Sequence, residues 1–147
     1  MLSLQEISDR LEIQQLIVDY ANALDAHDFN ALDDIFMPDA FIDYTELGGI
    51  KGNYPEVKAW LEPTLGFFKH YTHLVGNMGI KVSGDTATGR VACFNPMRMD
   101  LPDETSHVMF FGLWYHDKYV RTPAGWRIAE RVEEKCFDHN MPVYKGD

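Results

Sequence analysis

The sequence has few cysteines, few basic side chains and no long apolar run. Only Cys93 and Cys136 occur among 147 residues, and two distant cysteines make neither a disulfide framework nor a thiolate metal site. We expect both to be small buried residues. The 13 basic side chains are outnumbered by 23 acidic ones, and the resulting net charge of −10 repels nucleic acids and anionic membrane surfaces.

Membrane and export signals are also missing from the sequence. No stretch approaches the roughly 18 consecutive apolar residues of a membrane-spanning helix. The start of the chain shows no basic segment followed by an apolar one. We therefore expect a cytoplasmic protein without membrane or nucleic-acid partners.

Recognisable metal and cofactor motifs are absent too. The six histidines show no zinc-like spacing, and the chain has neither a glycine-rich phosphate loop nor a strand-turn serine motif. On a strand, His73, Val75 and Asn77 would share one face and His70 would lie on the other, so His70 and His73 cannot share a metal ion. These absences exclude the metal, nucleotide and serine-hydrolase classes.

Aromatic side chains, in contrast, are plentiful. They make up 13% of the sequence, enough to line a cavity as well as fill a core. The length suits one domain spanning 1–147, and no linker, repeat or low-complexity tract divides it. Candidates for the walls of a pocket are Phe29, Trp60, Phe67, Phe68, Met97, Phe111 and Trp114.

The first half of the chain carries mainly helical patterns. Ser3 and Glu6 fit a capping box, and apolar residues then recur at helical spacing, which predicts a helix over 3–24. Asp28 is a candidate N-cap for a short helix ended by Pro38. A strand is predicted over 40–44. A third helix is predicted over 53–61, with a proline in its first turn and Pro63 limiting its extension.

The second half alternates with a period of two residues, from His70 onward. Turn sequences at 83–85, 101–103 and 122–125 divide it into four long antiparallel strands. Such long strands must twist and curl, and Gly112 is a candidate bulge. The predicted class is therefore α+β, with helices packed against one face of a curved sheet and a conical hollow between them.

Asp25, at the end of the first predicted helix, and His73 form a candidate catalytic pair. A carboxylate that binds one imidazole nitrogen fixes the tautomer and makes the other nitrogen more basic, as a general base requires. Alternatively, His73 is an ordinary interior histidine and Asp25 a turn residue. A carboxylate at a helix C-terminus opposes the macrodipole, however, which argues against a purely local role.

Several segments resemble the SnoaL-like group of the nuclear-transport-factor-2-like superfamily. They are YANALD at 20–25, FMPDA at 36–40 and GWRI at 125–128, with Tyr44 and His73 between them. The resemblance spans nearly the whole chain. The group includes scytalone dehydratase, bile acid 7α-dehydratase, hexachlorocyclohexane dehydrochlorinase, ketosteroid isomerase relatives and polyketide cyclases.

The resemblance implies a cone-shaped, mainly antiparallel mixed sheet wrapped around the N-terminal helix, an Asp/His dyad, and no metal or organic cofactor. Asp25 and His73 fall on the dyad of the dehydratases and the dehydrochlorinase. Tyr20 and Tyr44 fall on pocket tyrosines of the dehydratases. Further implied substrate-binding positions are Asn95, Met97 and Arg131.

The chain also departs from individual members of the group. Met97 replaces the second pocket histidine of scytalone dehydratase and Leu24 replaces a tyrosine, so scytalone itself is not the expected substrate. Tyr20 stands where the dehydrochlorinase has lysine. Taken without the resemblance, Tyr20 and Tyr44 are equally compatible with plain core, and Arg131 with a surface ion pair to Glu130, Glu133 or Glu134. By alternation, Asn95 and Met97 should face the same side.

These observations together predict a cofactor-independent, dehydratase-like lyase. It would remove a proton beside the carbonyl of a small hydrophobic cyclic substrate and then eliminate water. An isomerase or cyclase of the same fold would use the same base, and a non-catalytic ligand-binding module is an alternative of a different class. The resemblance further implies a homo-oligomer, with a trimer favoured over a dimer.

Overall fold

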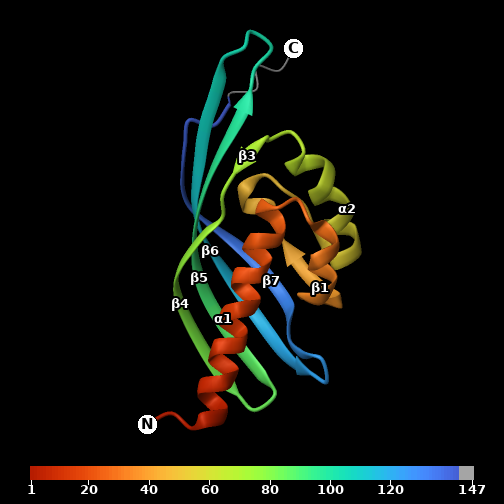
Figure 1. Cartoon of the computed structure of the whole chain (residues 1–147), viewed down its shortest axis with the longest axis vertical. Helices are drawn as coiled ribbons and strands as arrows, with labels where there is room; N and C mark the ends of the chain where they lie inside the picture. The colour runs from red at the N-terminus through yellow and green to blue at the C-terminus, as the bar shows by residue number, and fades with distance from the viewer. Residues whose placement is uncertain (143–147) are drawn as a thin grey trace.

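A curved sheet and two α-helices make up the computed structural model, which describes residues 1–142 (Figure 1). Over this range, helix α1 (Leu4–Asp25) and α2 (Tyr54–Leu65) are accompanied by the 3₁₀ helices η1 (Phe29–Asp34) and η2 (Thr45–Leu47). The strands are β1 (Phe36–Asp43), β2 (Lys51–Asn53), β3 (His70–Tyr71), β4 (Leu74–Ser83), β5 (Thr86–Asp100), β6 (Ser106–Thr122) and β7 (Gly125–His139).

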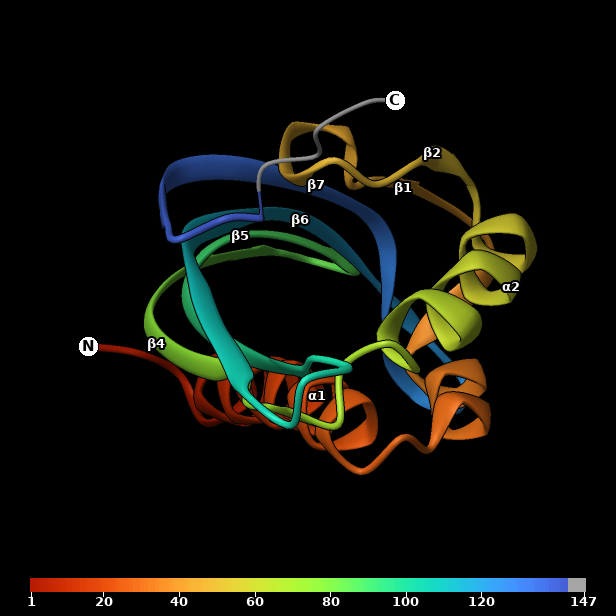
Figure 2. The ribbon, with the colours of Figure 1, turned by 90° about the horizontal axis from the view of Figure 1, so that it is seen from above.

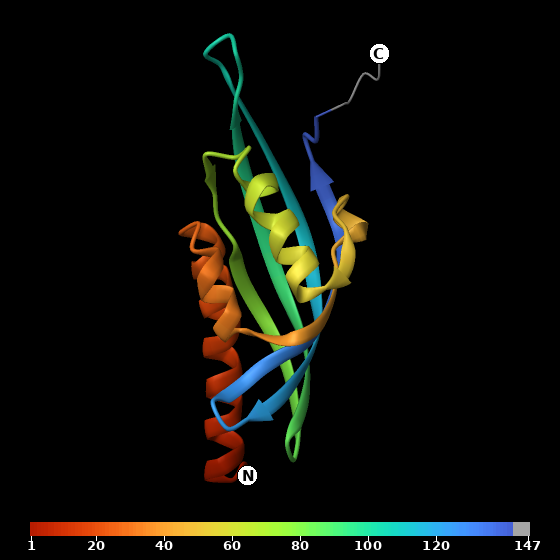
Figure 3. The ribbon, with the colours of Figure 1, turned by 90° about the vertical axis from the view of Figure 1, so that its right-hand side faces the viewer.

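The seven described strands form one sheet in the order β2-β1-β7-β6-β5-β3, with β4 also paired to β5. Only β1 and β7 run parallel, and the other pairs are antiparallel. Seen from above, the sheet curls into an arc, with α1 across its open side and α2 beside it (Figure 2). Figure 3 shows α2 crossing in front of the strands. The predicted α+β class with a curved, mainly antiparallel sheet is therefore confirmed.

Helix α1 begins and ends close to the predicted bounds. The Ser3 hydroxyl accepts a hydrogen bond from the Glu6 backbone N–H at 3.1 Å, while the Glu6 carboxylate binds Arg10 at 2.9 Å. Only half of the capping box therefore forms. The buried face of the helix packs into the curl of the sheet through Ile13, Leu16, Ile17, Tyr20, Ala23 and Leu24.

The segment after α1 differs from its prediction. The short helix is a 3₁₀ helix that ends at Asp34, and β1 then begins at Phe36 and runs through Pro38 instead of starting at residue 40. Pro38 falls where the register between β1 and β7 shifts, between Phe36 and Phe41. Because the ladder is interrupted there, the missing proline N–H removes no regular hydrogen bond.

Helix α2 also continues further than predicted. Asn53 and Glu56 form a complete capping box, with backbone-to-side-chain bonds of 3.2 and 3.1 Å. The helix passes through Pro63 and ends at Leu65. The prediction that Pro63 limits the helix was therefore wrong, because an end-of-helix proline costs only one backbone bond.

The four long strands are confirmed, but His73 does not lie inside one. His73 falls in the break between β3 and β4. In β4 the register shifts between Val75 and Met78, so both pack against the core while Asn77 is exposed. The expected common face of His73 and Asn77 is thus wrong, because a bulge changes the parity of the strand.

A bulge lies beside Gly112, but on the partner strand and not at the glycine predicted to form it. Gly112 pairs with Phe137 and Leu113 with Lys135, so Cys136 on β7 is the extra residue. The register between β6 and β7 shifts between Gly112 and Leu113. A Cβ atom at Gly112 would overlap the half-exposed ring of Phe137, which would have to move to admit a larger residue.

The two cysteines behave differently from each other. Cys93 is buried, as expected, but Cys136 is exposed on the outer face of β7, where its sulfur accepts a hydrogen bond from Trp114 Nε1 at 3.1 Å. The expectation of burial was wrong for Cys136, because this residue is the extra one in the bulge of β7 and lies outside the core. Among the described residues, no helix has the length and apolar character needed to cross a membrane.

An ion pair between the buried Asp9 and the half-buried Arg121 joins the start of α1 to the β6–β7 hairpin. Asp9 is 2% exposed and accepts bonds from Arg121 Nη1 at 2.7 Å, Arg121 Nη2 at 2.8 Å and Trp126 Nε1 at 3.1 Å. The Arg121 hydrogen bonds lower the pKa of Asp9 from 3.8 to about 2. The Asp9 carboxylate therefore stabilises the fold above its unfolded pKa, and that contribution disappears as the pH falls toward 2.

We predict that Arg121→Ala lowers the free energy of unfolding by about 2–3 kcal/mol at pH 7, because it leaves a buried carboxylate with fewer donors. Urea denaturation followed by circular dichroism measures this. The difference from the wild type should shrink below pH 3.8, as Asp9 is protonated. Lys135→Ala, which breaks an exposed pair with Asp138, should cost less than about 1 kcal/mol. Equal losses in both variants would contradict the prediction.

Candidate active site

Asp25 and His73 are in direct contact. Asp25 is the last residue of α1, and its Oδ1 lies 2.7 Å from His73 Nδ1. The backbone N–H of His73 also donates to both carboxylate oxygens, at 3.0 Å each. The side chain of His73 is 8% exposed and that of Asp25 27%. With Nδ1 held by the carboxylate, Nε2 is the imidazole nitrogen left for a ligand.

The backbone on both sides of this pair is also fixed. The Tyr71 hydroxyl donates to the Leu24 carbonyl at 2.6 Å, which joins β3 to the end of α1. Thr72 donates its N–H to the Pro96 carbonyl at 3.1 Å, and its own carbonyl accepts from Asn95 Nδ2 at 3.0 Å. The backbone that carries the imidazole is therefore fixed by hydrogen bonds to α1 and β5.

His73 lines a cavity of about 210 Å³ between α1, α2 and the concave face of the sheet. Pockets for drug-sized ligands usually measure roughly 300–1,000 Å³, so this one suits a smaller molecule. In the described part of the chain, no three His, Cys, Asp or Glu side chains gather as metal ligands would. The cavity is mainly apolar, and its polar lining side chains are Tyr20, Tyr44, Thr64, His73, Asn95 and Glu133.

Two buried tyrosines form one polar group of the cavity. Tyr20 on α1 and Tyr44 after β1 are 1% and 3% exposed, and their hydroxyl oxygens are 2.7 Å apart. Burial raises the pKa of Tyr20 to about 12 and that of Tyr44 well above 10. Both phenols are therefore neutral hydrogen-bond donors at neutral pH.

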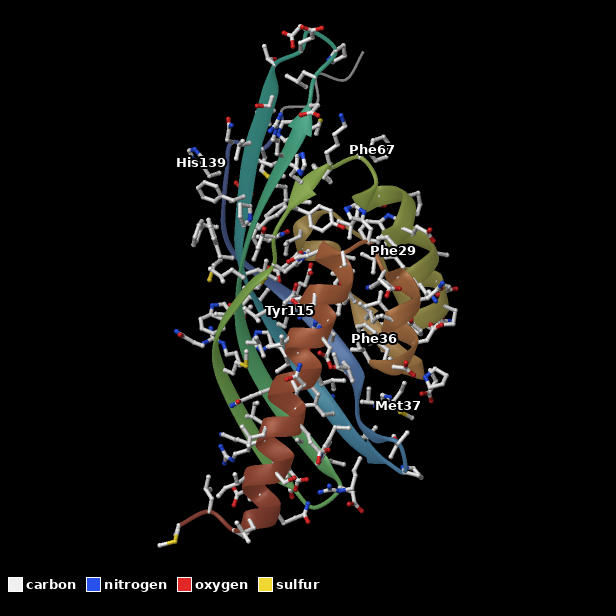
Figure 4. The ribbon with its side chains drawn as sticks, in the orientation of Figure 1. Phe29, Phe36, Met37, Phe67, Tyr115 and His139 are labelled. Carbon is white, nitrogen blue, oxygen red and sulfur yellow. The ribbon has the colours of Figure 1, made fainter. Side chains whose placement is uncertain are left out.

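Arg131 is fully buried and does not line the cavity. Its Nε and Nη2 donate to the two Asp117 oxygens at 2.8 and 2.7 Å, and its guanidinium stacks 4.2 Å from the Tyr20 ring and 4.0 Å from the Tyr115 ring. Figure 4 shows Tyr115 between α1 and the sheet. Both expectations for Arg131, direct substrate contact and a surface pair with a neighbouring glutamate, are corrected, because it is buried against Asp117, which lies directly opposite on the adjacent strand β6.

Asn95 and Met97 both line the cavity, as alternation along β5 requires. Of the other aromatic candidates, Trp60, Phe68 and Phe111 line it. Phe67 is 76% exposed and points outward in Figure 4. Phe29 lies in the core outside the cavity, and Trp114 lies on the outer face beneath Arg90.

The sequence analysis missed Glu133 as a cavity residue. It lies on β7, is 9% exposed and contributes to the cavity wall. Burial raises its pKa from 4.5 to about 8. Since Arg131 and Glu133 are two residues apart on one strand, they share a face, so recognising Arg131 as buried would have revealed Glu133 as well.

Comparison with known proteins identifies the family. Residues 5–132 match the SnoaL-like domain, and the chain belongs to this family. Uncharacterised proteins of Mycobacterium tuberculosis and Mycobacterium bovis are 57% identical over 141 residues, which cover 96% of this chain and 95% of each relative.

Solved structures share the same fold. A Kribbella flavida protein superposes with a TM-score of 0.82 at 21% identity, covering 90% of this chain and 94% of its own. A Novosphingobium aromaticivorans protein provisionally named scytalone dehydratase gives 0.82 at 20% identity, covering 93% and 90%. A type 2 hexachlorocyclohexane dehydrochlorinase gives 0.81 at 18% identity, covering 95% and 93%. At these identities the likeness establishes the fold alone.

We predict that neutral His73 carries its proton on Nδ1, because Asp25 accepts a hydrogen bond from that nitrogen. Long-range ¹H–¹⁵N NMR spectra distinguish the two tautomers. Asp25→Ala should convert His73 to a mixture of tautomers. The exposed His139 serves as an internal control and should remain a mixture in both proteins. A wild-type His73 protonated on Nε2 would contradict the geometry.

Proposed function

We propose that the protein is a cofactor-independent lyase that acts on a small, hydrophobic, cyclic hydroxy ketone. The observation that carries this proposal is the hydrogen bond between Asp25 and His73 Nδ1 at the wall of a small, mainly apolar cavity. An imidazole held in this way presents Nε2 as a base, and an apolar cavity suits a neutral substrate.

In this proposal His73 removes the proton from the carbon beside the carbonyl. Asp25 orients the ring and stabilises the imidazolium that forms. As the C–H bond breaks, negative charge develops on the carbonyl oxygen. The Tyr20 and Tyr44 phenols are both neutral, and one donates to the other. The hydrogen that this bond leaves free stabilises that charge by hydrogen bonding.

The remaining substrate-binding residues then act on the leaving hydroxyl and on the ring. Asn95 uses its Nδ2 to bind Thr72, which leaves its amide oxygen as an acceptor for a substrate hydroxyl. Met97 and the aromatic walls pack against the apolar ring. The leaving hydroxyl needs a proton to depart as water, and the imidazolium of His73 is one source of it.

Elimination is favoured over the other reactions of this fold. Two of the structural neighbours are named for eliminations, loss of water in one and of hydrogen chloride in the other. Double-bond migration and ring closure would begin with the same proton abstraction, so an isomerase or cyclase is the alternative within the proposal. A module that only binds ligands would not need a hydrogen-bonded base at its cavity wall.

The test uses 3-hydroxycyclohexanone in D₂O, with deuterium exchange beside the carbonyl and loss of water followed by NMR. His73→Ala should slow both by about 1,000-fold, because it removes the base. Asp25→Asn should slow both by about 100-fold or more, because the imidazole is no longer oriented and its imidazolium no longer stabilised by a carboxylate. Tyr44→Phe should cost about tenfold, since Tyr20 remains.

His70→Ala is the matched control, because His70 is exposed and three residues away from His73. It should retain the wild-type rates. Full activity in His73→Ala or Asp25→Asn would refute the assigned base.

We further propose that the protein assembles as a homo-oligomer through the outer face of its sheet. Leu74, Phe94 and Phe137 are 62%, 38% and 54% exposed and lie in one row across β4, β5 and β7. Phe110 stacks on His139 in the same region, with ring centroids 4.9 Å apart. An exposed apolar row of this kind is typical of an interface, and the family resemblance favours a trimer.

We expect light scattering after size exclusion to report a trimer for the wild type. Phe94→Asp should give monomers with an unchanged circular dichroism spectrum, because it places a charge in the apolar row. Thr88→Asp, on the polar part of the same face of β5, should remain trimeric. A monomeric wild type would exclude the interface.

A reducing compartment suits this protein. Both Cys93 and Cys136 are free thiols, as is usual for proteins kept under cytosolic redox conditions. We therefore propose that the protein is located in the cytoplasm.

A further inference from the structure

Glu133 is a buried carboxyl group that the steps above do not use. It is 9% exposed and lines the cavity, yet no side chain or backbone group of the described residues forms a hydrogen bond with it. Asp25 lies behind His73 and does not line the cavity. Glu133 is therefore the one carboxyl group among the described lining residues, and its oxygens are free to meet a ligand.

The surroundings of Glu133 favour its neutral form. The nearest cation, Arg131, is already paired with Asp117 through two hydrogen bonds, and Asp43 on β1 adds a repulsive negative charge. Burial is the largest influence and raises the pKa of Glu133 to about 8. The titratable and charged groups around it are Arg131 on β7, Asp43 on β1, Tyr20 on α1, Tyr44, Cys93 on β5 and Tyr115 on β6.

Glu133 and His73 lie at different parts of the cavity wall. Glu133 is on β7, His73 follows β3, and strands β6 and β5 separate them in the sheet. Because the sheet is curved and the cavity holds only about 210 Å³, a ligand that fills it contacts both side chains. A base and an acid are thereby available to one substrate from two directions.

We propose that Glu133 is the general acid of the site and gives its proton to the oxygen that leaves the substrate. This inference rests on the proposed lyase function and names the proton source that the function requires. It also defines the substrate class more closely, as an uncharged ring with a carbonyl group and a hydroxyl on the second carbon away from it.

The proton and electron balance of the step closes without a further reactant. His73 Nε2 takes the proton beside the carbonyl, and the electron pair of that C–H bond passes through the enolate into the new carbon–carbon double bond. The C–O bond breaks, its electron pair leaves with the oxygen, and the Glu133 proton converts the leaving group to water. The imidazolium proton then returns to the Glu133 carboxylate through water, which restores both groups.

The experiment compares two probes that differ only in the leaving group. 3-Hydroxycyclohexanone needs a proton to lose its hydroxyl, whereas 3-chlorocyclohexanone loses chloride without one, and both give cyclohexenone. Glu133→Gln should slow elimination of the hydroxyl by about 100-fold or more. Elimination of chloride and deuterium exchange beside the carbonyl should stay within about threefold of the wild type, because neither needs a proton from Glu133.

Two controls accompany this comparison. Glu134→Gln changes the neighbouring glutamate, which pairs with His116 on the outer face of the sheet, and should leave all three rates unchanged. Glu133→Asp keeps an acid in a shifted position and should restore part of the hydroxyl elimination that Glu133→Gln loses.

A pH profile of the wild type gives a test that needs no variant. The ratio of hydroxyl to chloride elimination cancels the titration of His73, which serves both probes. The acid must be protonated, so the ratio should fall about tenfold per pH unit above about 8.

The outcomes separate the two proposals. The role of Glu133 would be overturned if Glu133→Gln slowed both probes equally, or if the ratio of hydroxyl to chloride elimination did not change with pH. Deuterium exchange that still depended on His73 would then leave the assigned base intact. Wild-type protein that shows no exchange above the uncatalysed rate would refute the lyase function, and the role of Glu133 would fall with it.

Discussion

The three hydrogen bonds that Asp25 accepts from His73 hold the site together. A carboxylate at the C-terminal end of a helix is repelled by the helix dipole, and here the backbone and ring N–H groups of His73 offset that repulsion. The same bonds join the end of α1 to the break between β3 and β4. One carboxylate therefore both orients the imidazole and, together with the bond from Tyr71 to Leu24, joins α1 to the sheet.

The buried charged residues of β7 near the Asp25–His73 pair differ in whether they have a partner of opposite charge. Arg131 and Asp117 neutralise each other beneath Tyr20, so they support the phenol without presenting an ion to the cavity. Glu133, two residues along the same strand, has no such partner and is protonated instead. The raised pKa of Glu133 favours its neutral form at neutral pH, which suits a neutral ligand and makes a proton available for donation.

Local sequence patterns predicted those structural elements that depend on interactions between residues close together in the chain. The cap at Ser3 and the turns between the long strands were readable from neighbouring residues, whereas the bulge expected at Gly112 lies opposite it, at Cys136 on β7. The predictions based on Pro38 and Pro63 were wrong. Interrupted strand pairing tolerates proline at position 38, and the last turn of a helix tolerates it at position 63. The burial of Arg131 and Glu133 was hidden because Asp117, which pairs with Arg131, lies on another strand. The pairing of Asp25 with His73, 48 residues apart, came from family resemblance, since no local pattern encodes it.

The contact between Tyr20 and Tyr44 has a consequence for how a ligand is received. Each hydroxyl has one hydrogen, and either oxygen is able to donate to the other across 2.7 Å. Rotation of two O–H bonds reverses the direction of this bond without moving a heavy atom. The single free hydrogen then projects from one ring or from the other, so a ligand oxygen has two alternative docking points and the ring it belongs to has two orientations in the same unaltered cavity.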